Sequence, residues 1–136
     1  MPCPFFEPER ISLDPSHPTA RVPLLDEYEG ACHAGEAALP APDALRFRCC
    51  NQGYCRGICE HFPAREVRSS LRYDVMRQTA TVLDVLCIEE QSYAPLRWRP
   101  VQYFVETGQL QPEITDVCLR AQLLAFCRSY LARWPQ

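Results

Sequence analysis

Residues 64–136 alternate apolar and polar side chains in the manner of strands. Three segments carry this pattern, and turn-forming residues separate them: Val67–Met76, Ala80–Ile88 and Leu96–Val105. The middle segment is the most apolar and is rich in β-branched residues, so we expect it to be the most buried. Short connections between neighbouring strands favour antiparallel pairing. The pattern therefore predicts a small three-stranded antiparallel meander.

The last segment of the chain has the spacing of an amphipathic helix. Apolar residues recur every three or four positions from Leu119 to Trp134. Pro112 suits the first position of a helix, and Glu113 and Asp116 would then lie in the first turn, where negative charge is favourable. We expect this C-terminal helix to pack across one face of the meander, which gives an α+β fold.

Residues 1–63 show neither pattern over any length. Residues 45–49 alternate apolar and basic side chains, which predicts a short extended piece, and Asn51, Gln52 and Gly53 are turn formers after it. Residues 1–44 contain eight of the thirteen prolines, and proline is excluded from helix interiors and from central strands. We expect an irregular region that a metal clip holds in place. Because this region has too little apolar surface to fold alone, we interpret residues 1–136 as a single domain. Its cysteine-rich part is 1–63, and its sheet-and-helix part is 64–136.

Cysteine is the most informative residue type in this chain. The sequence has nine cysteines, of which six fall within the first 59 residues. The odd number, together with the lack of a secretory signal at the N-terminus, argues against a disulfide framework. Clustered thiols in a reducing compartment more often bind metal. The three later cysteines fit core packing in a strand and a helix: Cys87, Cys118 and Cys127.

Four thiols in separate loops form our predicted ligand set: Cys3, Cys32, Cys50 and Cys59. Side chains of adjacent residues in an extended chain point in opposite directions, so Cys49 and Cys50 would not serve one metal together. Cys50 leads directly into a turn and is therefore preferred. Cys49, which would face the interior, and Cys55, inside the next loop, remain the rivals.

The spacing of the thiols bears on the metal. Thiolates suit zinc and iron–sulfur clusters alike. Structural zinc sites are usually built from cysteine pairs two to four residues apart, and the sequence contains no Cys-x2-Cys pair. Iron–sulfur clusters accept thiolates from scattered loops, so the leading prediction is a [4Fe–4S] cluster, with zinc as the alternative. Arg46, Arg48 and Arg56 would offset the negative charge of the cluster.

Other ligands and other chemistry stay open at this point. His33 and His61 each lie close to a cysteine and could replace one thiolate in a zinc site. Cys55, beside Arg56, is the candidate for a reactive thiol, with His61 as its base. The sequence predicts no catalytic site otherwise, and it identifies no small-molecule substrate.

Charge and hydropathy limit the partners of the protein. Residues 1–44 carry eight acids and two arginines, a net charge of −6, whereas residues 45–77 carry seven arginines and three acids, a net charge of +4. We expect the acidic part to cover the basic part, which disfavours nucleic-acid binding. No apolar run is long enough to span a membrane. These features predict a cytoplasmic protein with a redox or interaction partner protein.

Overall fold

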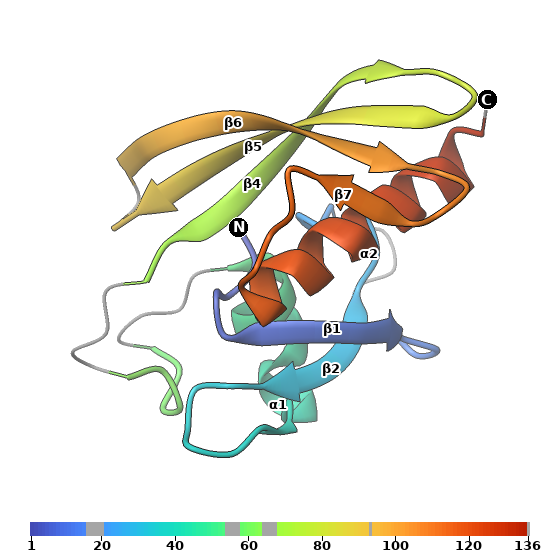
Figure 1. The fold of residues 1–136 in the computed structure, drawn as a ribbon. Coiled ribbons are helices and arrows are strands. Elements are labelled where there is room, and N and C mark those ends of the chain that lie inside the picture. Colours follow the sequence, from blue (N-terminus) through green and yellow to red (C-terminus); the bar gives the residue numbers. More distant parts are fainter. Residues whose placement is uncertain (16–20, 54–57, 64–67, 93, 136) are drawn as a thin grey trace.

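Two antiparallel sheets and a long helix form the fold of this chain (Figure 1). The computed structural model describes residues 1–15, 21–53, 58–63, 68–92 and 94–135. One sheet has the strand order β4 (Ser70–Gln78), β5 (Val82–Gln91), β6 (Ala94–Phe104) and β7 (Gln109–Gln111). The other has the order β1 (Phe6–Ile11), β2 (Tyr28–Cys32) and β3 (Leu39–Pro40). The predicted α+β class is confirmed.

The predicted meander is present as β4, β5 and β6, and a fourth strand extends it. Each strand pairs antiparallel with the next, in sequence order. On β5 the residues Leu83, Val85 and Cys87 alternate with less buried neighbours and face the core. Strand β7, which the sequence analysis missed, pairs only with the last three residues of β6. A three-residue strand is too short to show an alternating pattern.

The C-terminal helix begins later than predicted. Helix α2 (Val117–Arg133) starts five residues beyond Pro112. Asp116 precedes the helix with extended backbone angles, and its side chain accepts a hydrogen bond of 3.0 Å from the backbone N–H of Leu119. It is therefore the N-cap, and this satisfies one of the N–H groups that the first turn leaves unpaired.

The prediction of an irregular N-terminal part was wrong for β1, β2 and β3, which form a sheet. Two prolines fall in these strands, Pro8 in β1 and Pro40 in β3. Both strands lie at the edges of this sheet, where a proline removes no ladder hydrogen bond. The central strand β2 contains none. The prolines therefore restrict the order of the strands but do not prevent a sheet.

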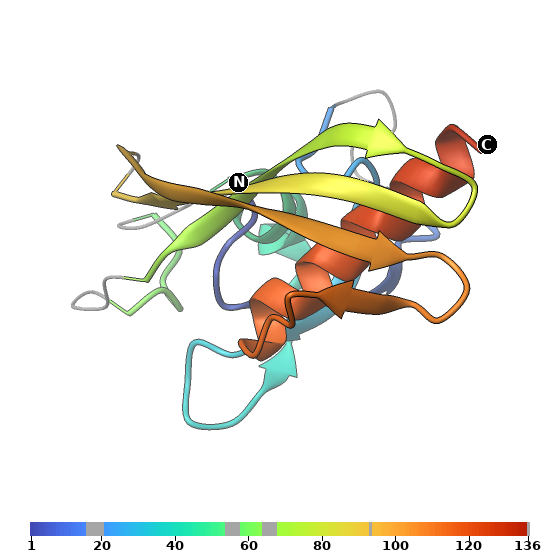
Figure 2. The ribbon, with the colours of Figure 1, turned by 45° about the horizontal axis from the view of Figure 1, so that its top comes forward.

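Helix α2 lies between the two sheets rather than across one of them (Figures 1 and 2). It contacts β1 on one side and β4 on the other. The buried core accordingly takes residues from both parts of the chain, among them Phe6 and Leu24 from the first part and Leu83 and Leu123 from the second. No helix in the described residues is long and apolar enough to cross a membrane.

Gly30 allows β1 and β2 to approach closely. It pairs with Pro8 in the β1–β2 ladder. A Cβ atom at Gly30 would overlap the carbonyl oxygen of Glu7 and would lie 2.9 Å from the Cα atom of Pro8. Because both obstacles are backbone atoms, the strands themselves would have to move apart.

We expect Gly30→Ala to lower the free energy of unfolding by about 2–3 kcal/mol, as overpacking does in a tightly packed interior. The matched control is Gly35→Ala, because Gly35 is exposed and its added Cβ would meet its nearest neighbour at 3.9 Å. The control should stay within about 0.5 kcal/mol of the parent protein. Urea denaturation measures both variants, and equal stability of the two would contradict the close approach.

Candidate metal centre

Five of the described cysteines line one small cavity on the N-terminal side of the fold: Cys3, Cys32, Cys49, Cys50 and Cys59. All four predicted ligands are among them. They come from the segment before β1, the end of β2, the π-helix η1 (Arg46–Gln52) and a later loop. Four separate segments therefore bring their thiols to one place, and only the last two, with Cys50 and Cys59, are close in sequence.

Backbone hydrogen bonds connect these segments at the cysteines themselves. The N–H of Cys3 donates to the carbonyl of Cys50 at 3.0 Å, and the N–H of Phe6 donates to the carbonyl of Cys3 at 3.0 Å. The N–H of His33, next to Cys32, donates to the carbonyl of Phe5 at 2.8 Å. Main-chain contacts thus hold the backbone of Cys3 and Cys50 together and fix the backbone next to Cys32.

Asn51 holds η1 against β2 and so positions Cys50. Its side chain is fully buried, accepts from the N–H of Tyr28 at 2.8 Å and donates to the carbonyl of Tyr28 at 2.9 Å. The same amide nitrogen donates to the carbonyl of Arg46 at 2.8 Å. An amide that pairs with both backbone groups of one strand residue acts like a neighbouring strand. The sequence analysis treated Asn51 only as part of a turn.

The expectation that residues 45–49 are extended was wrong. The chain forms α1 (Asp43–Leu45) and then η1, and both Cys49 and Cys50 are buried. In a helix, adjacent side chains do not point in opposite directions as they do in a strand. The geometric reason for excluding Cys49 therefore falls away, and both thiols line the cavity.

The surroundings of the thiols are apolar. Phe6, Phe62 and Leu45 contribute to the wall of the cavity, whose volume is about 20 Å³. This is room for about one water molecule. Cys3, Cys32 and Cys59 are partly exposed, whereas Cys50 is buried. A group larger than a water molecule would require the lining side chains to move apart.

Burial raises the pKa of two of the thiols. The pKa of Cys3 rises to about 12, mainly because burial disfavours the thiolate, and the neighbouring Cys32 and Cys59 raise it further. Burial also raises the pKa of Cys50 far above its ordinary value, and Cys3 and Cys32 add to this. Without a cation both thiols are neutral at pH 7. A bound metal reverses this balance because it stabilises the thiolate directly.

Within the described ranges, no group of three or more His, Cys, Asp or Glu side chains has the geometry to hold a metal ion. The four thiols share a cavity, but their sulfur atoms are not gathered at the distances of a single-ion site. Around zinc, with Zn–S bonds of about 2.3 Å, the sulfur atoms of a tetrahedral site would lie only about 3.8 Å apart.

The two histidines differ in their surroundings. His61 lines the cavity together with the thiols. The Nε2 atom of His33 instead forms a 2.7 Å contact with the Oε1 atom of Glu7, a hydrogen bond that occupies this nitrogen. The structure thus leaves His61 as the better placed of the two alternative zinc ligands.

Arg46, expected to offset the charge of a cluster, forms ion pairs with acidic side chains. Its guanidinium contacts Glu27 at 2.9 Å, Asp43 at 3.2 Å and Glu29 at 3.7 Å. For Arg46 these contacts agree with the expected cover by the acidic N-terminal part. Other arginines of the basic stretch pair with acids from later in the chain: Arg68 with Asp116, Arg72 with Glu90 and Arg77 with Asp84. Cys55, the candidate reactive thiol, and Arg56 lie outside the described residues.

Cys118 is the cysteine whose surroundings the sequence analysis missed. It lies in the first turn of α2 and is almost fully buried. Cys118 lies near the candidate ligands: it contributes to the raised pKa of Cys3, and Cys32 contributes to the raised pKa of Cys118. Cys118 does not line the cavity. Only the three-dimensional packing of α2 on β1 could reveal this proximity.

Comparison with known proteins adds no relative. No protein family model, no curated protein and no solved structure matches the chain. The function must therefore be argued from the site.

Cys87 offers a test of thiol burial away from the candidate metal centre. Burial raises its pKa to about 12, although Arg99 lowers it somewhat. In the unfolded chain this thiol ionises near its ordinary value of 9.0. Between these two values the unfolded state binds fewer protons than the folded state, so stability must fall as pH rises.

We expect the free energy of unfolding to decrease from about pH 9 upward, with a contribution from Cys87 of at most about 1.4 kcal/mol per pH unit. In Cys87→Val, which fills the same core position without an ionisable group, this part of the slope should disappear. Urea denaturation between pH 8 and pH 11, in the presence of a reductant, measures both proteins. An unchanged slope in the variant would show that Cys87 ionises normally in the fold.

Proposed function

We propose that this protein holds an iron–sulfur cluster on Cys3, Cys32, Cys50 and Cys59 and uses it for electron transfer or redox sensing. The observation that supports this most directly is the shared cavity: four thiols from four separate segments line it together. Cysteine is among the residues most often buried, but scattered core cysteines do not have to meet. Their meeting is what a common ligand would require.

The distribution of the ligands favours a cluster over a single zinc ion. Zinc sites are typically built on closely spaced pairs, and here each thiol of the set comes from a different segment. A cluster places iron and sulfide between the thiolates and so bridges ligands that are not gathered at one point. The apolar wall formed by Phe6, Phe62 and Leu45 would limit the access of water, which is one of the factors that set a reduction potential.

Partial exposure of the site fits the exchange of electrons with another protein. Cys3, Cys32 and Cys59 each reach the surface in part. A cluster held there would lie near the edge of the protein, where a redox partner can approach it. Free thiols and a [4Fe–4S] cluster both call for a reducing compartment such as the cytoplasm.

A zinc-stabilised interaction module is the second candidate, and the position of His61 favours it. This side chain lines the same cavity as the thiols and would complete a site of three cysteines and one histidine. Three thiolates with one imidazole form a common structural zinc site. The protein would then have no redox chemistry, and the metal would contribute directly to folding.

Purification without oxygen, followed by a visible spectrum and elemental analysis, separates the candidates. A brown protein with about four irons per chain supports the proposal. A colourless protein with about one zinc supports the second candidate, and a colourless protein without metal overturns both.

Single substitutions then identify the ligands. We expect Cys3→Ser, Cys32→Ser, Cys50→Ser and Cys59→Ser each to lose most of the iron, because oxygen is a poorer ligand than thiolate for this metal group. Cys87→Val is the matched control, since Cys87 is a buried cysteine outside the cavity. It should keep its full iron content.

Two further variants distinguish the chosen set from its rivals. Cys49→Ser and Cys118→Ser should keep the iron, because we assign neither residue as a ligand. Loss of iron in Cys49→Ser together with full iron in Cys50→Ser would exchange these two residues in the ligand set. Full iron in both Cys3→Ser and Cys32→Ser would contradict the proposed centre.

A further inference from the structure

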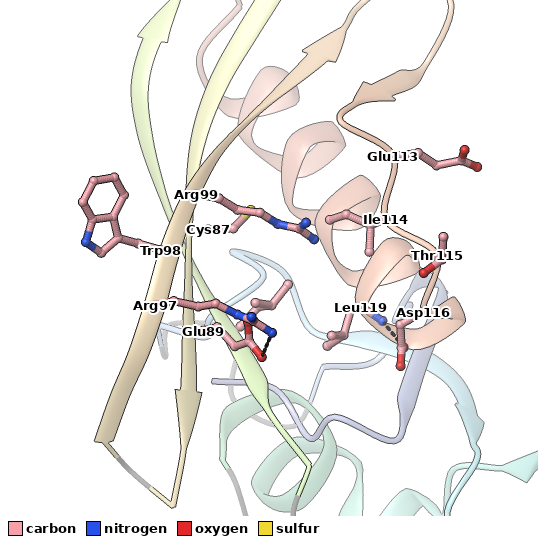
Figure 3. A pocket seen from close by; sticks show the side chains of 11 residues that line it. Cys87, Glu89, Arg97, Trp98, Arg99, Glu113, Ile114, Thr115, Asp116 and Leu119 are labelled. Atoms are coloured by element: carbon pink, nitrogen blue, oxygen red, sulfur yellow. Dashed lines mark hydrogen bonds and ion pairs between the residues drawn. The ribbon is translucent and has the colours of Figure 1, made fainter.

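A second cavity, with a volume of about 390 Å³, lies at the far end of the four-stranded sheet. It is bounded by the inner face of β5 and β6 and by the segment that leads into α2 (Figure 3). Six residues define its character: Cys87, Glu89, Arg97, Arg99, Ile114 and Leu119. None of them belongs to the candidate metal centre.

The cavity lies beside the part of β6 that precedes its pairing with β7. Strand β6 has eleven residues, but β7 pairs only with Gln102, Tyr103 and Phe104. The chain then leaves the sheet and reaches α2 at Val117. The earlier part of β6 therefore has no neighbouring strand on that side, and its inner face is directed toward the start of α2.

Two arginines point into this space from the core side of β6. Arg97 and Arg99 lie on the same face as Val101 and Tyr103, which are 1% and 6% exposed. This follows from the period of two along a strand, which also separates the two arginine Cα atoms by about 6.8 Å. Both arginines lie beyond the buried part of this face and are exposed to solvent.

Only one of the two arginines is paired. Arg97 and Glu89 are cross-strand neighbours, and the Nε atom of Arg97 donates to the Oε2 atom of Glu89 at 2.5 Å. Arg99 lies opposite Cys87, whose buried thiol is neutral. No described residue forms a hydrogen bond or ion pair with the Arg99 guanidinium, which extends into the cavity in Figure 3. Its five donors are therefore available to a ligand.

Glu89 is the acid nearest in effect to Arg99, which helps to lower the pKa of its carboxyl, but Glu89 forms its hydrogen bonds with Arg97. Within the described residues, no acid on the opposite wall forms a hydrogen bond or ion pair with Arg99. Asp116 caps α2 through the N–H of Leu119 and also contacts Arg68 at 3.5 Å. Glu113 is exposed, and its side chain is directed away from the two arginines (Figure 3). The wall nearest to Arg99 is instead apolar, with Ile114 buried and Leu119 partly buried.

We propose that this cavity binds a small organic oxyanion. Its carboxylate or phosphate group accepts paired hydrogen bonds from the Arg99 guanidinium, and its compact apolar body lies against Ile114 and Leu119. Planar guanidinium groups bind both kinds of head group in this bidentate manner. Arg97 is paired with Glu89, so the two side chains together add no net charge, and the head group depends on Arg99. This inference is independent of the metal proposed at the thiols.

The test uses hexanoate, hexyl phosphate and the uncharged hexanamide, which is close to hexanoate in shape. Each is titrated into the full chain while NMR follows the Nε–H signal of Arg99 and the methyl signals of Ile114 and Leu119. We expect saturable shifts at all three residues with at least one of the two anions. Hexanamide should bind at least about tenfold more weakly, because it cannot form the charge-assisted pair. The tighter of the two anions identifies the head group.

Arg99→Gln should weaken binding of that anion about tenfold or more. The matched control is Arg77→Gln, because Arg77 is another exposed arginine of the same sheet and contacts Asp84 at 2.9 Å, outside this cavity. It should bind as the parent protein does. The proposal is overturned if neither anion shifts the three signals, if hexanamide binds as tightly as hexanoate, or if both variants lose affinity equally.

Discussion

The arrangement of the two halves of this protein depends on one buried amide. Gln122 of α2 is fully inaccessible to solvent, and its Nε2 atom donates to the carbonyls of Cys3 and Phe6, each at 2.8 Å. These carbonyls lie at the bend that leads into β1, where the proline-rich chain cannot form a regular ladder. An unpaired carbonyl in this position would cost about 1–3 kcal/mol. Gln122 donates to both carbonyls, of which that of Cys3 also accepts from the N–H of Phe6 at 3.0 Å, and it thereby connects α2 to the first cysteine of the candidate centre.

Further buried polar contacts extend this connection along α2. The hydroxyl of Tyr28 on β2 donates to the carbonyl of Ala125 at 3.0 Å. The backbone of Tyr28 is in turn held by Asn51, next to Cys50. A series of side-chain hydrogen bonds therefore runs from the helix through β2 to η1. Such contacts require defined geometry, so they specify one arrangement of the segments where apolar packing alone would allow several.

The sequence predicted the elements that follow a simple period. The three strands of the meander and the C-terminal helix were found because alternation and 3–4 spacing run over nine residues or more. The helix start was misplaced because Pro112 is as common before a helix as in its first turn, and the true cap is Asp116. β7 and the N-terminal strands were missed because they are short or contain proline on an edge.

The candidate centre was predictable only in part. Residue type and clustering selected four thiols that do share a cavity. The helical form of residues 43–52 was not visible, because Cys49 and Cys50 follow an alternation of arginine and apolar residues that is typical of a strand. Contacts such as those of Gln122 and the proximity of Cys118 to Cys3 join residues more than a hundred positions apart. No local pattern records contacts of this kind.

The short β7 has a consequence for how this protein behaves in a crowded solution. It leaves most of one side of β6 without a neighbouring strand, and such an open edge is ordinarily a template onto which another chain can add. Pro95 and Pro100 lie in this stretch while β6 is paired with β5 on its other side. Proline has no N–H group to donate to an added strand. Fewer donors are thus left in this stretch for another chain to pair with, which makes edge-to-edge assembly less favourable.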